Sequence, residues 1–462
     1  MSRALPDRLM IVPFSKPFDA TGDRAVIIPG SKSLTNRALL LAALADGETT
    51  LRGVLFSDDT ERMLEGLASL GFQVGIDREK CIVNVKGCNG QMPKRSEQDV
   101  ELFLGNAGTA TRFMTAAMTL ASENTSAIIT GIPRMLERPI GELVEPLRQL
   151  GAKIEYLGEE GYPPIRVHGL GKGIMRGGDL VMKPTVSSQY LSALLQIGPY
   201  LHEGLTMIFD GPVTSLPYVK MTVELMRQFG AKIDTTDDWS IISVKPGGYQ
   251  GNTKDIEPDA SNASYAMGMA AATQDAIVEI KHLSENSLQG DAAFAKELAK
   301  MGADVQYLDD AIIVRGTGKL KGIDADFNAI PDMVQTIAVV ALFAKGETTI
   351  RDVGNLRIKE TDRMAALKNE LTKLGATVKI VGDDITIIPP DQNKLKHPNG
   401  QPITESNPAV IETYDDHRMA MSFAIAGTKQ VGVVIDDPAC VNKTFPTYFE
   451  QLSQLNTAAQ RQ

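Results

Sequence analysis

An internal repeat restricts what this chain of 462 residues can fold into. A helical segment with one apolar face, followed by Gly and a short β-rich stretch, occurs five times at intervals of about 75 residues. The copies read LASLGFQV, LRQLGAKI, MRQFGAKI, LAKMGADV and LTKLGATV, and their glycines are Gly71, Gly151, Gly230, Gly302 and Gly375. Gly at this position is typical of a left-handed helix C-cap, so each copy predicts a helix that turns into a strand.

A second element alternates with the first and occurs six times. It consists of a polar or small-residue loop, a helix that is apolar nearly all round, a turn and a β-rich stretch. The first and last copies are SKSLTNRALLLAALADGETTLRGV and YDDHRMAMSFAIAGTKQVGVVIDD. A helix that is apolar on all sides belongs in a core, whereas a one-faced helix covers it. Together the two elements predict an α/β (α+β) fold of six βαβαββ units, which account for nearly the whole chain.

The two ends of the chain are predicted to share one domain. The sixth copy stops at FPTYFEQLSQLN, without a final strand, and the N-terminal stretch LMIVPFSK has the β character to supply one. We therefore expect two domains of three units each. One domain spans residues 31–257, and the other combines residues 1–30 with residues 258–462. The predicted crossing points, Pro29-Gly30 and Glu257-Pro258, contain residues that break regular structure.

The charge balance excludes several classes of function. Lys and Arg number 47 against 57 Asp and Glu, so the net charge is -10 and the pI is about 5.2. An acidic chain lacks the broad basic face that nucleic acids or anionic membranes need, and no apolar run approaches the roughly 20 residues of a membrane helix. Neither Cys nor His residues have metal-ligand spacing, and the N-terminus does not resemble a signal peptide. We expect a cytoplasmic protein that needs no metal ion for its structure.

The residues that open the six apolar helices form candidate anion sites. A helix N-terminus offers unpaired N–H groups and about half a positive charge, which attract phosphate and carboxylate groups. If the units pack around pseudo-threefold axes, the helix starts can face one crevice between the domains. Taken singly, Ser, Asn and Asp at these positions are more typical of plain N-caps. The helix starts are Ser31-Lys32-Ser33, Asn106 to Thr109, Ser187 to Gln189, Asp259 to Asn262, Asp332, and Asp416-His417-Arg418.

Three cation-rich segments follow the β-rich stretches of their units. They are RIKETDR, with Lys359 and Arg363, PRMLERP, with Arg134 and Arg138, and DPACVNKTFP, with Lys443. Each one alone is typical of a solvated helix face or a surface turn. Their shared position in the repeat favours a second set of loops at the same crevice, which would concentrate positive charge in an acidic protein. GNAGTATR matches a nucleotide phosphate loop only weakly, because the Gly-Lys-Ser/Thr ending is missing.

Eight blocks together resemble the 5-enolpyruvylshikimate-3-phosphate synthase family, in family order over essentially the full chain. They are PGSKSLTNR, LGNAGTATR, GIPRMLERPIG, SSQY, IPDMVQTIAVVALFAKGETT, NLRIKETDR, YDDHRMAM and DPACVNKTFP. The resemblance implies two domains, each of three βαβαββ units around a pseudo-threefold axis (an inside-out α/β barrel), with the active site in the crevice between them. It implies transfer of enolpyruvyl from phosphoenolpyruvate to the 5-hydroxyl of shikimate 3-phosphate, with release of phosphate. This is the 3-phosphoshikimate 1-carboxyvinyltransferase reaction of aromatic amino acid biosynthesis, and it uses no metal or organic cofactor.

The same resemblance assigns two sets of binding residues. Those implied for phosphoenolpyruvate are Lys32, Gly108, Thr109, Arg134, Gln189, Arg363, Arg418 and Lys443. Those implied for shikimate 3-phosphate are Lys32, Ser33, Arg37, Ser187, Ser188, Gln189, Ser215, Tyr218, Asp332, Asn355 and Lys359. Many family members have Pro where this chain has Phe113. We expect that difference to alter inhibitor sensitivity more than activity.

The implied reaction needs two proton transfers. A proton must reach C3 of phosphoenolpyruvate, and another must leave the sugar hydroxyl. Two carboxylates in different surroundings can divide such tasks. Asp332 is the candidate base for the hydroxyl. Glu360 is the candidate donor to C3, and Lys32 is the competing donor.

Two alternative functions are compatible with a repeat of this kind. UDP-N-acetylglucosamine enolpyruvyl transferase shares the fold, but it would be expected to carry Lys-Asn in place of Lys32-Ser33 and a Cys in the segment 130–139, where this chain has none. A non-catalytic sugar-phosphate binder gains nothing from an acid and a base, so Asp332 and Glu360 favour an enzyme. We expect a monomer whose domains close on the substrates.

Overall fold

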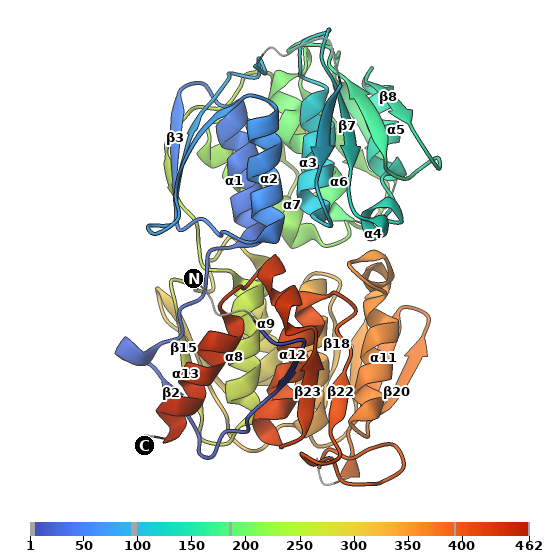
Figure 1. Ribbon diagram of the computed structural model, residues 1–462. Helices are drawn as coiled ribbons and strands as arrows, with labels where there is room; N and C mark the ends of the chain where they lie inside the picture. The colour runs from blue at the N-terminus through green and yellow to red at the C-terminus, as the bar shows by residue number, and fades with distance from the viewer. Residues whose placement is uncertain (1–4, 94–98, 184–186, 392–393, 461–462) are drawn as a thin grey trace. The chain divides into compact units, whose positions relative to one another are not determined.

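The computed structural model describes residues 5–93, 99–183, 187–391 and 394–460. The chain divides into two compact units (Figure 1). The continuous unit is Gly30–Glu257, and the discontinuous unit combines Met1–Pro29 with Pro258–Gln462. The chain therefore passes between the units at two points that are far apart in sequence.

The continuous unit contains three four-stranded sheets with the same strand order. In each sheet two neighbouring strands are parallel, a third strand runs antiparallel to them, and the fourth runs antiparallel to the third. In the second and third sheets a buried helix joins the two parallel strands. The first sheet is β14 (Thr253–Asp255), β3 (Glu48–Arg52), β5 (Ile82–Lys86) and β4 (Gln73–Asp77), with helices α1 (Lys32–Leu44) and α2 (Asp58–Ser69). The second is β6 (Val100–Phe103), β7 (Ser126–Thr130), β9 (Ile165–His168) and β8 (Lys153–Tyr156), with α3 (Gly108–Met118), α4 (Pro133–Leu136) and α5 (Gly141–Gln149). The third is β10 (Gly178–Met182), β11 (Leu205–Phe209), β13 (Ile241–Val244) and β12 (Ile233–Thr235), with α6 (Ser188–Ile197) and α7 (Leu216–Gln228).

The discontinuous unit repeats this plan with two complete sheets and a shorter one. The first is β2 (Asp19–Ala20), β15 (Ile277–Lys281), β17 (Ala311–Arg315) and β16 (Asp304–Tyr307), with α8 (Ala260–Ala272), η3 (Gly290–Ala293) and α9 (Phe294–Met301). The second is β18 (Asp324–Asp326), β19 (Thr348–Arg351), β21 (Asp384–Ile388) and β20 (Thr377–Val381), with η4 (Pro331–Met333), α10 (Val334–Val340), η6 (Gly354–Ile358) and α11 (Arg363–Lys373). The third is β22 (Ala409–Ile411), β23 (Val433–Asp436) and β1 (Arg8–Met10), with α12 (His417–Lys429), η8 (Pro438–Lys443) and α13 (Tyr448–Gln460).

The N-terminal residues complete sheets whose other strands come from far along the chain. β1 pairs antiparallel with β23, with Arg8 opposite Asp436, which confirms that LMIVPFSK supplies the strand missing from the sixth copy. β2 pairs in parallel with β15, so the N-terminal segment contributes a second strand that the repeat did not predict. The continuous unit closes in a similar way, because β14 at its end pairs in parallel with β3 near its start.

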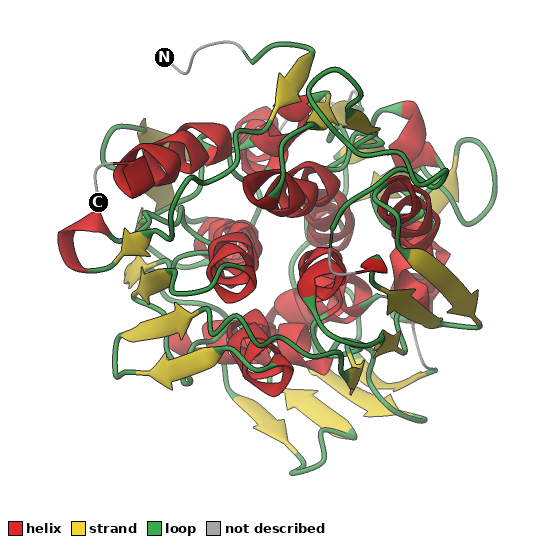
Figure 2. Cartoon of the chain, turned by 90° about the horizontal axis from the view of Figure 1, so that it is seen from below, coloured by secondary structure: helices red, strands yellow, loops and turns green. Residues whose placement is uncertain are grey.

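The apolar helices form the core of each unit, as their sequences predicted. Every residue of α3 is buried, and so is Ala260–Ala271 of α8. In the discontinuous unit α8, α10 and α12 pack against one another, with the strands outside them (Figures 1 and 2). The three helices meet through buried hydroxyls: Thr336 lies 2.9 Å from Ser264 and 3.4 Å from Ser422 (Oγ1 to Oγ). Each hydroxyl comes from a different helix, as expected near a pseudo-threefold axis.

The one-faced helices end as predicted. Gly302 caps α9 in the left-handed conformation with φ 108°, where a side chain would be strained. The other four repeat glycines also have positive φ. Within the described residues, no helix is both long and apolar enough to cross a bilayer.

Candidate functional site

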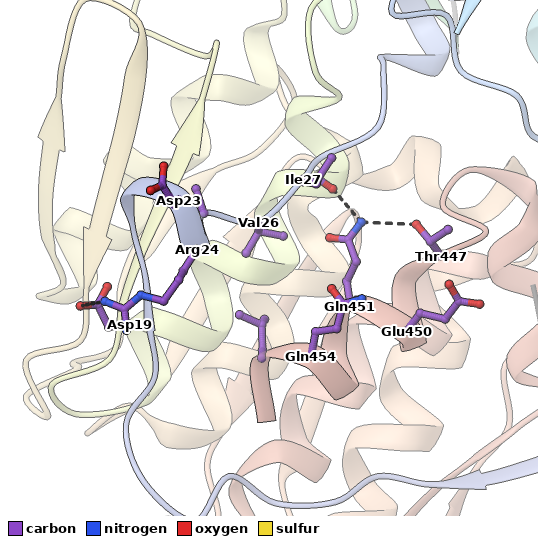
Figure 3. Close-up of a pocket in the computed structure, with 11 residues that line it drawn as sticks. Asp19, Asp23, Arg24, Val26, Ile27, Thr447, Glu450, Gln451 and Gln454 are labelled. Carbon is purple, nitrogen blue, oxygen red and sulfur yellow. Dashed lines mark hydrogen bonds and ion pairs between the residues drawn. The ribbon is translucent and has the colours of Figure 1, made fainter. Parts of the chain in front are cut away.

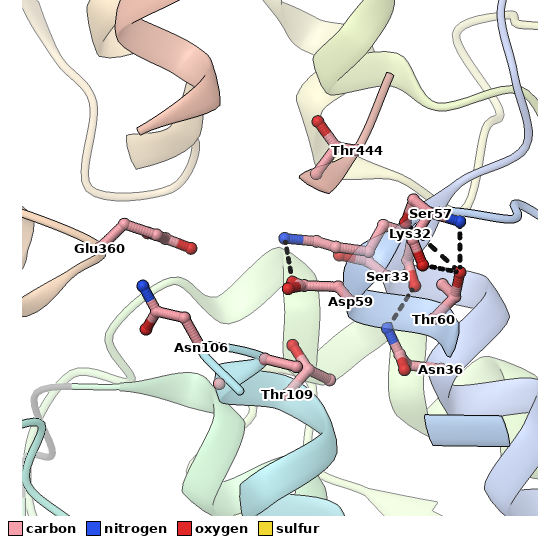
Figure 4. A network of polar contacts seen from close by, with 12 residues as sticks. Lys32, Ser33, Asn36, Ser57, Asp59, Thr60, Asn106, Thr109, Glu360 and Thr444 are labelled. Carbon is pink, nitrogen blue, oxygen red and sulfur yellow. Dashed lines mark hydrogen bonds and ion pairs between the residues drawn. The ribbon is translucent and has the colours of Figure 1, made fainter. Parts of the chain in front are cut away.

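The start of α1 places Lys32 beside a buried carboxylate. Ser31 caps the helix by accepting a hydrogen bond from the backbone N–H of Leu34 at 3.3 Å. Lys32 Nζ lies 3.5 Å from Oδ2 of Asp59, whose side chain is only 4% exposed (Figure 4). Asp59 belongs to the first turn of α2, which a capping box closes. The ammonium group is therefore held next to a helix N-terminus, where its charge adds to that of the helix dipole.

The starts of α3 and α6 lie side by side in the continuous unit. Gln189 Nε2 donates a hydrogen bond to Thr109 Oγ1 at 3.4 Å, so the structure brings together two residues predicted to bind phosphoenolpyruvate. Arg138 lies at the same place, 4% exposed, and donates to the backbone oxygen of Asn106 at 3.1 Å and to its Oδ1 at 3.0 Å. A Cβ added to Gly108 would lie 2.7 Å from Arg138 Nη2. The absence of a side chain at Gly108 therefore makes room for this guanidinium.

Arg134, the predicted binding residue of the same loop, is more exposed than Arg138. Its side chain is 32% exposed, and Nη1 lies 2.9 Å from Oε2 of Glu137 in an ion pair at i,i+3. Sequence reasoning noted Arg138 but did not assign it to the site. The signal that could have identified it is its spacing: it ends the same short loop and can reach back to the start of α3.

Arg37 contacts two other residues that were predicted to bind shikimate 3-phosphate, Ser33 and Tyr218. Its guanidinium donates to the backbone oxygens of Ser33 at 2.9 Å and Tyr218 at 3.4 Å, and to Oγ1 of Thr222 at 2.7 Å. It also lies over the ring of Phe113, 5.4 Å from the centroid. Burial lowers the pKa of Arg37 to about 10, which still leaves it charged at neutral pH. Arg37 belongs to α1, and its bonds to Tyr218 and Thr222 therefore join α1 to α7.

The remaining predicted residues of the continuous unit lie at helix starts. Ser187 is the N-cap of α6 and accepts a hydrogen bond from the backbone N–H of Gln189 at 3.3 Å. Ser188 follows it and is buried. Ser215 is the N-cap of α7 with φ 52°, a left-handed conformation that is uncommon for a residue other than Gly. Backbone strain of this kind is often found at functional sites.

In the discontinuous unit, Arg363 is surrounded by three carboxylates. It begins α11, is 1% exposed, and donates to Asp416 from Nε at 2.7 Å and from Nη2 at 3.2 Å. Its other contacts are Asp332 Oδ1 at 3.2 Å and Glu360 Oε2 at 3.0 Å. Burial acts to lower the pKa of Arg363, but Asp416, Glu360 and Asp332 outweigh it and raise that pKa. This guanidinium is permanently charged.

Asp332 bridges the two arginines of this unit. Its Oδ1 accepts from Arg363, and its Oδ2 accepts from Arg418 Nη2 at 2.7 Å. Arg418 Nη1 also donates to the Asp332 backbone oxygen at 3.3 Å and to the Tyr265 hydroxyl at 3.4 Å. The backbone N–H of Arg418 donates to Asp416, the N-cap of α12, at 2.9 Å. One carboxylate pair, Asp332 and Asp416, thereby sets the positions of both guanidinium groups.

Three more predicted residues lie on short segments of this unit. Asn355 belongs to η6, Lys359 follows it, and Lys443 ends η8 with 8% of its surface exposed. Each of them follows the β-strand of its repeat, as predicted.

A further carboxylate, Asp291 of η3, is buried and accepts a hydrogen bond from the Ser261 hydroxyl. Burial and the charge of Asp332 raise the pKa of Asp291 to about 6.

Four of the cations predicted to bind substrate lie next to carboxylates. Lys32 faces Asp59, Arg134 faces Glu137, Arg363 faces three carboxylates, and Arg418 faces Asp332. Each cation is thus paired with carboxylates of its own unit. Such pairs fix the orientation of a cation and leave it available to an anion that offers better geometry.

Two other features of the described residues bear on ligands. No group of three or more His, Cys, Asp or Glu side chains among them is arranged to hold a metal ion. A cavity of about 460 Å³ lies in the discontinuous unit between the N-terminal segment 19–27 and α13, and it is lined by none of the predicted site residues (Figure 3).

Helix N-termini with cations held beside them, in two α/β units, are typical of proteins that bind small phosphorylated or carboxylated molecules. The family model of EPSP synthase (3-phosphoshikimate 1-carboxyvinyltransferase) matches residues 21–452, so the chain belongs to that family. The chloroplastic 3-phosphoshikimate 1-carboxyvinyltransferase 1 of Nicotiana tabacum is 44% identical, over 97% of this chain and 85% of its own. The 3-phosphoshikimate 1-carboxyvinyltransferase of Sulfurovum sp. is 45% identical, over 94% and 96%. A structure of EPSP synthase from Acinetobacter baumannii matches with a TM-score of 0.78 and 26% identity, over 97% of this chain and 98% of that one.

These comparisons confirm the resemblance, the two-domain α/β fold and the class of enzyme. The chain is a transferase of the shikimate pathway with 3-phosphoshikimate 1-carboxyvinyltransferase activity, and it serves aromatic amino acid biosynthesis. The contacts within each unit bear on which residues perform the reaction.

Proposed function

We propose that the residues assigned above bind phosphoenolpyruvate and shikimate 3-phosphate and transfer enolpyruvyl to the 5-hydroxyl, with release of phosphate. The observation that carries this proposal is the bridge from Arg363 through Asp332 to Arg418, which places a carboxylate between two buried guanidinium groups. Guanidinium groups bind carboxylates and phosphates in two-point contacts, and both occur in these substrates. A phosphate-release assay that omits each substrate in turn tests it, and release without shikimate 3-phosphate would contradict it.

The anions are proposed to divide between the predicted residue sets. Lys32, the starts of α3 and α6, Arg134, Arg363, Arg418 and Lys443 bind phosphoenolpyruvate. The hydroxyls of Ser33, Ser187, Ser188 and Ser215, with Arg37, Tyr218, Gln189, Asn355 and Lys359, bind shikimate 3-phosphate. Since these residues belong to both units, the substrates bind where residues of both can reach them, in a crevice between domains 31–257 and 1–30 plus 258–462.

Asp332 is proposed as the base for the 5-hydroxyl. Two guanidinium groups each donate a hydrogen bond to one of its oxygens, Arg363 to Oδ1 at 3.2 Å and Arg418 to Oδ2 at 2.7 Å. They also fix both of its oxygens, so the direction from which a hydroxyl can approach is restricted. A base must lie within hydrogen-bond reach of its proton, and a fixed carboxylate meets this need without further ordering.

The donor to C3 is proposed to be Lys32 or Glu360. Lys32 is paired with Asp59 at 3.5 Å, and Glu360 is paired with Arg363 at 3.0 Å. Each candidate is therefore held in place by an ion pair of its own unit. Single-turnover transfer of solvent deuterium to C3, measured in Lys32→Met and Glu360→Gln, decides between them.

Closure of the two domains on shikimate 3-phosphate is proposed as well, because a small ligand must engage residues of both. Small-angle scattering tests it, and an unchanged radius of gyration at saturating ligand would contradict it.

We propose that the enzyme acts as a monomer in the cytoplasm and binds no nucleic acid. Its net charge of -10 supports the last point.

A further inference from the structure

The start of α8 contacts two segments of the proposed site, one through Thr444 and one through Arg418. No residue of this helix was assigned a role in the reaction. The segment Asp259 to Asn262 was one of the six helix starts of the repeat. Asp259 caps α8 by accepting a hydrogen bond from the backbone N–H of Asn262 at 2.8 Å. The cap uses the backbone N–H of Asn262, and its side chain makes separate contacts.

Asn262 uses both ends of its amide on one residue. Its Nδ2 donates to the backbone oxygen of Thr444 at 3.0 Å, and its Oδ1 accepts from the Thr444 hydroxyl at 3.5 Å. Asn262 and Thr444 are 2% and 3% exposed, so water does not compete for these bonds. The two residues are 182 positions apart in sequence. Their contact therefore fixes the end of η8 against the first turn of α8.

Thr444 directly follows Lys443, the residue proposed to bind phosphoenolpyruvate from this segment. The backbone oxygen that Asn262 holds is one peptide unit away from the Cα of Lys443. Beyond it, the chain is anchored by aromatic packing: the ring of Tyr448 lies 5.6 Å from that of Phe445 and 5.7 Å from that of Tyr265. The direction in which the Lys443 side chain leaves the backbone thus depends on two anchors, and both are on α8.

The same face of α8 also reaches the second cation of this unit. Tyr265 lies three residues after Asn262, which places both on one side of the helix. Its hydroxyl accepts a hydrogen bond from Arg418 Nη1 at 3.4 Å. Two contacts three residues apart on one buried helix therefore act on Lys443 and on Arg418.

We propose that Asn262 is a positioning residue for phosphoenolpyruvate binding, which acts by holding Thr444 and thereby the backbone of Lys443. The proposal rests on the assignment of Lys443 to phosphoenolpyruvate made above. Loss of the amide removes two buried hydrogen bonds from the backbone next to Lys443. The ammonium group then samples directions that do not meet the substrate anion.

The test is a double-mutant cycle on the full-length enzyme, with phosphoenolpyruvate varied at saturating shikimate 3-phosphate. Asn262→Ala is expected to raise the KM for phosphoenolpyruvate about 3- to 10-fold, as for the loss of one net hydrogen bond, with the KM for shikimate 3-phosphate unchanged. In a Lys443→Met background the same substitution is expected to add nothing. Thr444→Ser keeps both bonds and should behave as the parent enzyme.

Ser264→Ala is the matched control, because it removes a buried hydroxyl of the same helix that bonds Thr336 and not Thr444. It is expected to leave both KM values unchanged, whatever it does to the melting temperature. An additive effect of Asn262→Ala and Lys443→Met, or an unchanged KM in Asn262→Ala, would overturn the positioning role alone. An unchanged KM in Lys443→Met would overturn the assignment of Lys443 as well.

Discussion

Arg363 and Asp416 form a buried two-point ion pair, with Nε to Oδ2 at 2.7 Å and Nη2 to Oδ1 at 3.2 Å. The side chains are 1% and 0% exposed. The pair joins the first residue of α11 to the N-cap of α12, and the same carboxylate accepts the backbone N–H of Arg418. Asp416 therefore holds two cations while it makes no predicted contact with substrate.

Asp416→Asn is expected to destabilise the protein by about 3 kcal/mol, because it removes one charge from a buried ion pair. Asn can still cap α12, so the loss reports on the pair and not on the helix start. Urea unfolding measures it. Asp362→Asn is the control, since Asp362 caps α11 by accepting from the backbone N–H of Ala365 at 3.0 Å and a cap of that kind survives in Asn. Equal losses in the two variants would contradict the prediction.

Lys32→Met is expected to lower kcat/KM by a factor of at least about 100, as for a lost charge-assisted contact in the transition state. The single change also removes the cation next to the buried Asp59 carboxylate, which can lower stability. The double variant Lys32→Met/Asp59→Asn separates the two effects, because it should restore the melting temperature and not the activity. Lys80→Met, in an exposed pair with Asp77, is the control. Recovery of most activity in the double variant would rule out the assigned role.

Gly108→Ala is expected to raise the KM for phosphoenolpyruvate about 10-fold, because its methyl group must displace Arg138, a buried cation bonded to Asn106. Steady-state kinetics with each substrate varied in turn measures this. Gly247→Ala is the control, since a Cβ there meets nothing within 4 Å. A KM within twofold of the parent value would show that Arg138 can move without cost.

Asp291→Asn is expected to change the pH dependence of stability. Burial and the charge of Asp332 raise the pKa of Asp291 to about 6, while Ser261 and Arg418 act in the opposite direction. Stability from this group is fully present below its unfolded-state pKa of about 4, and it is lost as the pH rises through the folded-state pKa. The amide cannot ionise and keeps an acceptor for the Ser261 hydroxyl. The variant should therefore gain on the parent between pH 4 and 6, by up to about 3 kcal/mol.

Urea unfolding at pH 4 and at pH 7 measures this gain. Asp391→Asn is a suitable control, because the Asp391 side chain is 93% exposed. If the difference between Asp291→Asn and the parent enzyme is the same at both pH values, the pKa of Asp291 is equal in the folded and unfolded states, which would contradict the prediction.

The architecture could be predicted because it repeats. Apolar patterning marked α8 and α12 as core helices, and the same elements in each copy placed the sheets around them. The strand from the N-terminus could be predicted because the sixth copy lacked one. β14 could not, because its pairing with β3 depends on how the continuous unit closes on itself and not on the local sequence.

The cations of the site could be predicted from family blocks, but their partners could not. Asp59 pairs with Lys32 and Asp416 pairs with Arg363, and nothing in the spacing of either pair predicts the contact. Such pairs arise where two helix starts meet in three dimensions.

The pairing of β1 with β23 has a consequence for how the protein is made. Arg8 and Asp436, which lie opposite each other in this sheet, are 428 positions apart. At about 5 to 20 residues per second, the ribosome needs roughly 20 to 90 seconds to add that much chain. The continuous unit emerges whole during this interval, while the first strand of the protein waits for a partner that is not yet synthesised. A nascent chain stalled after residue 257 should therefore carry one folded half and one exposed N-terminal strand for a chaperone to cover.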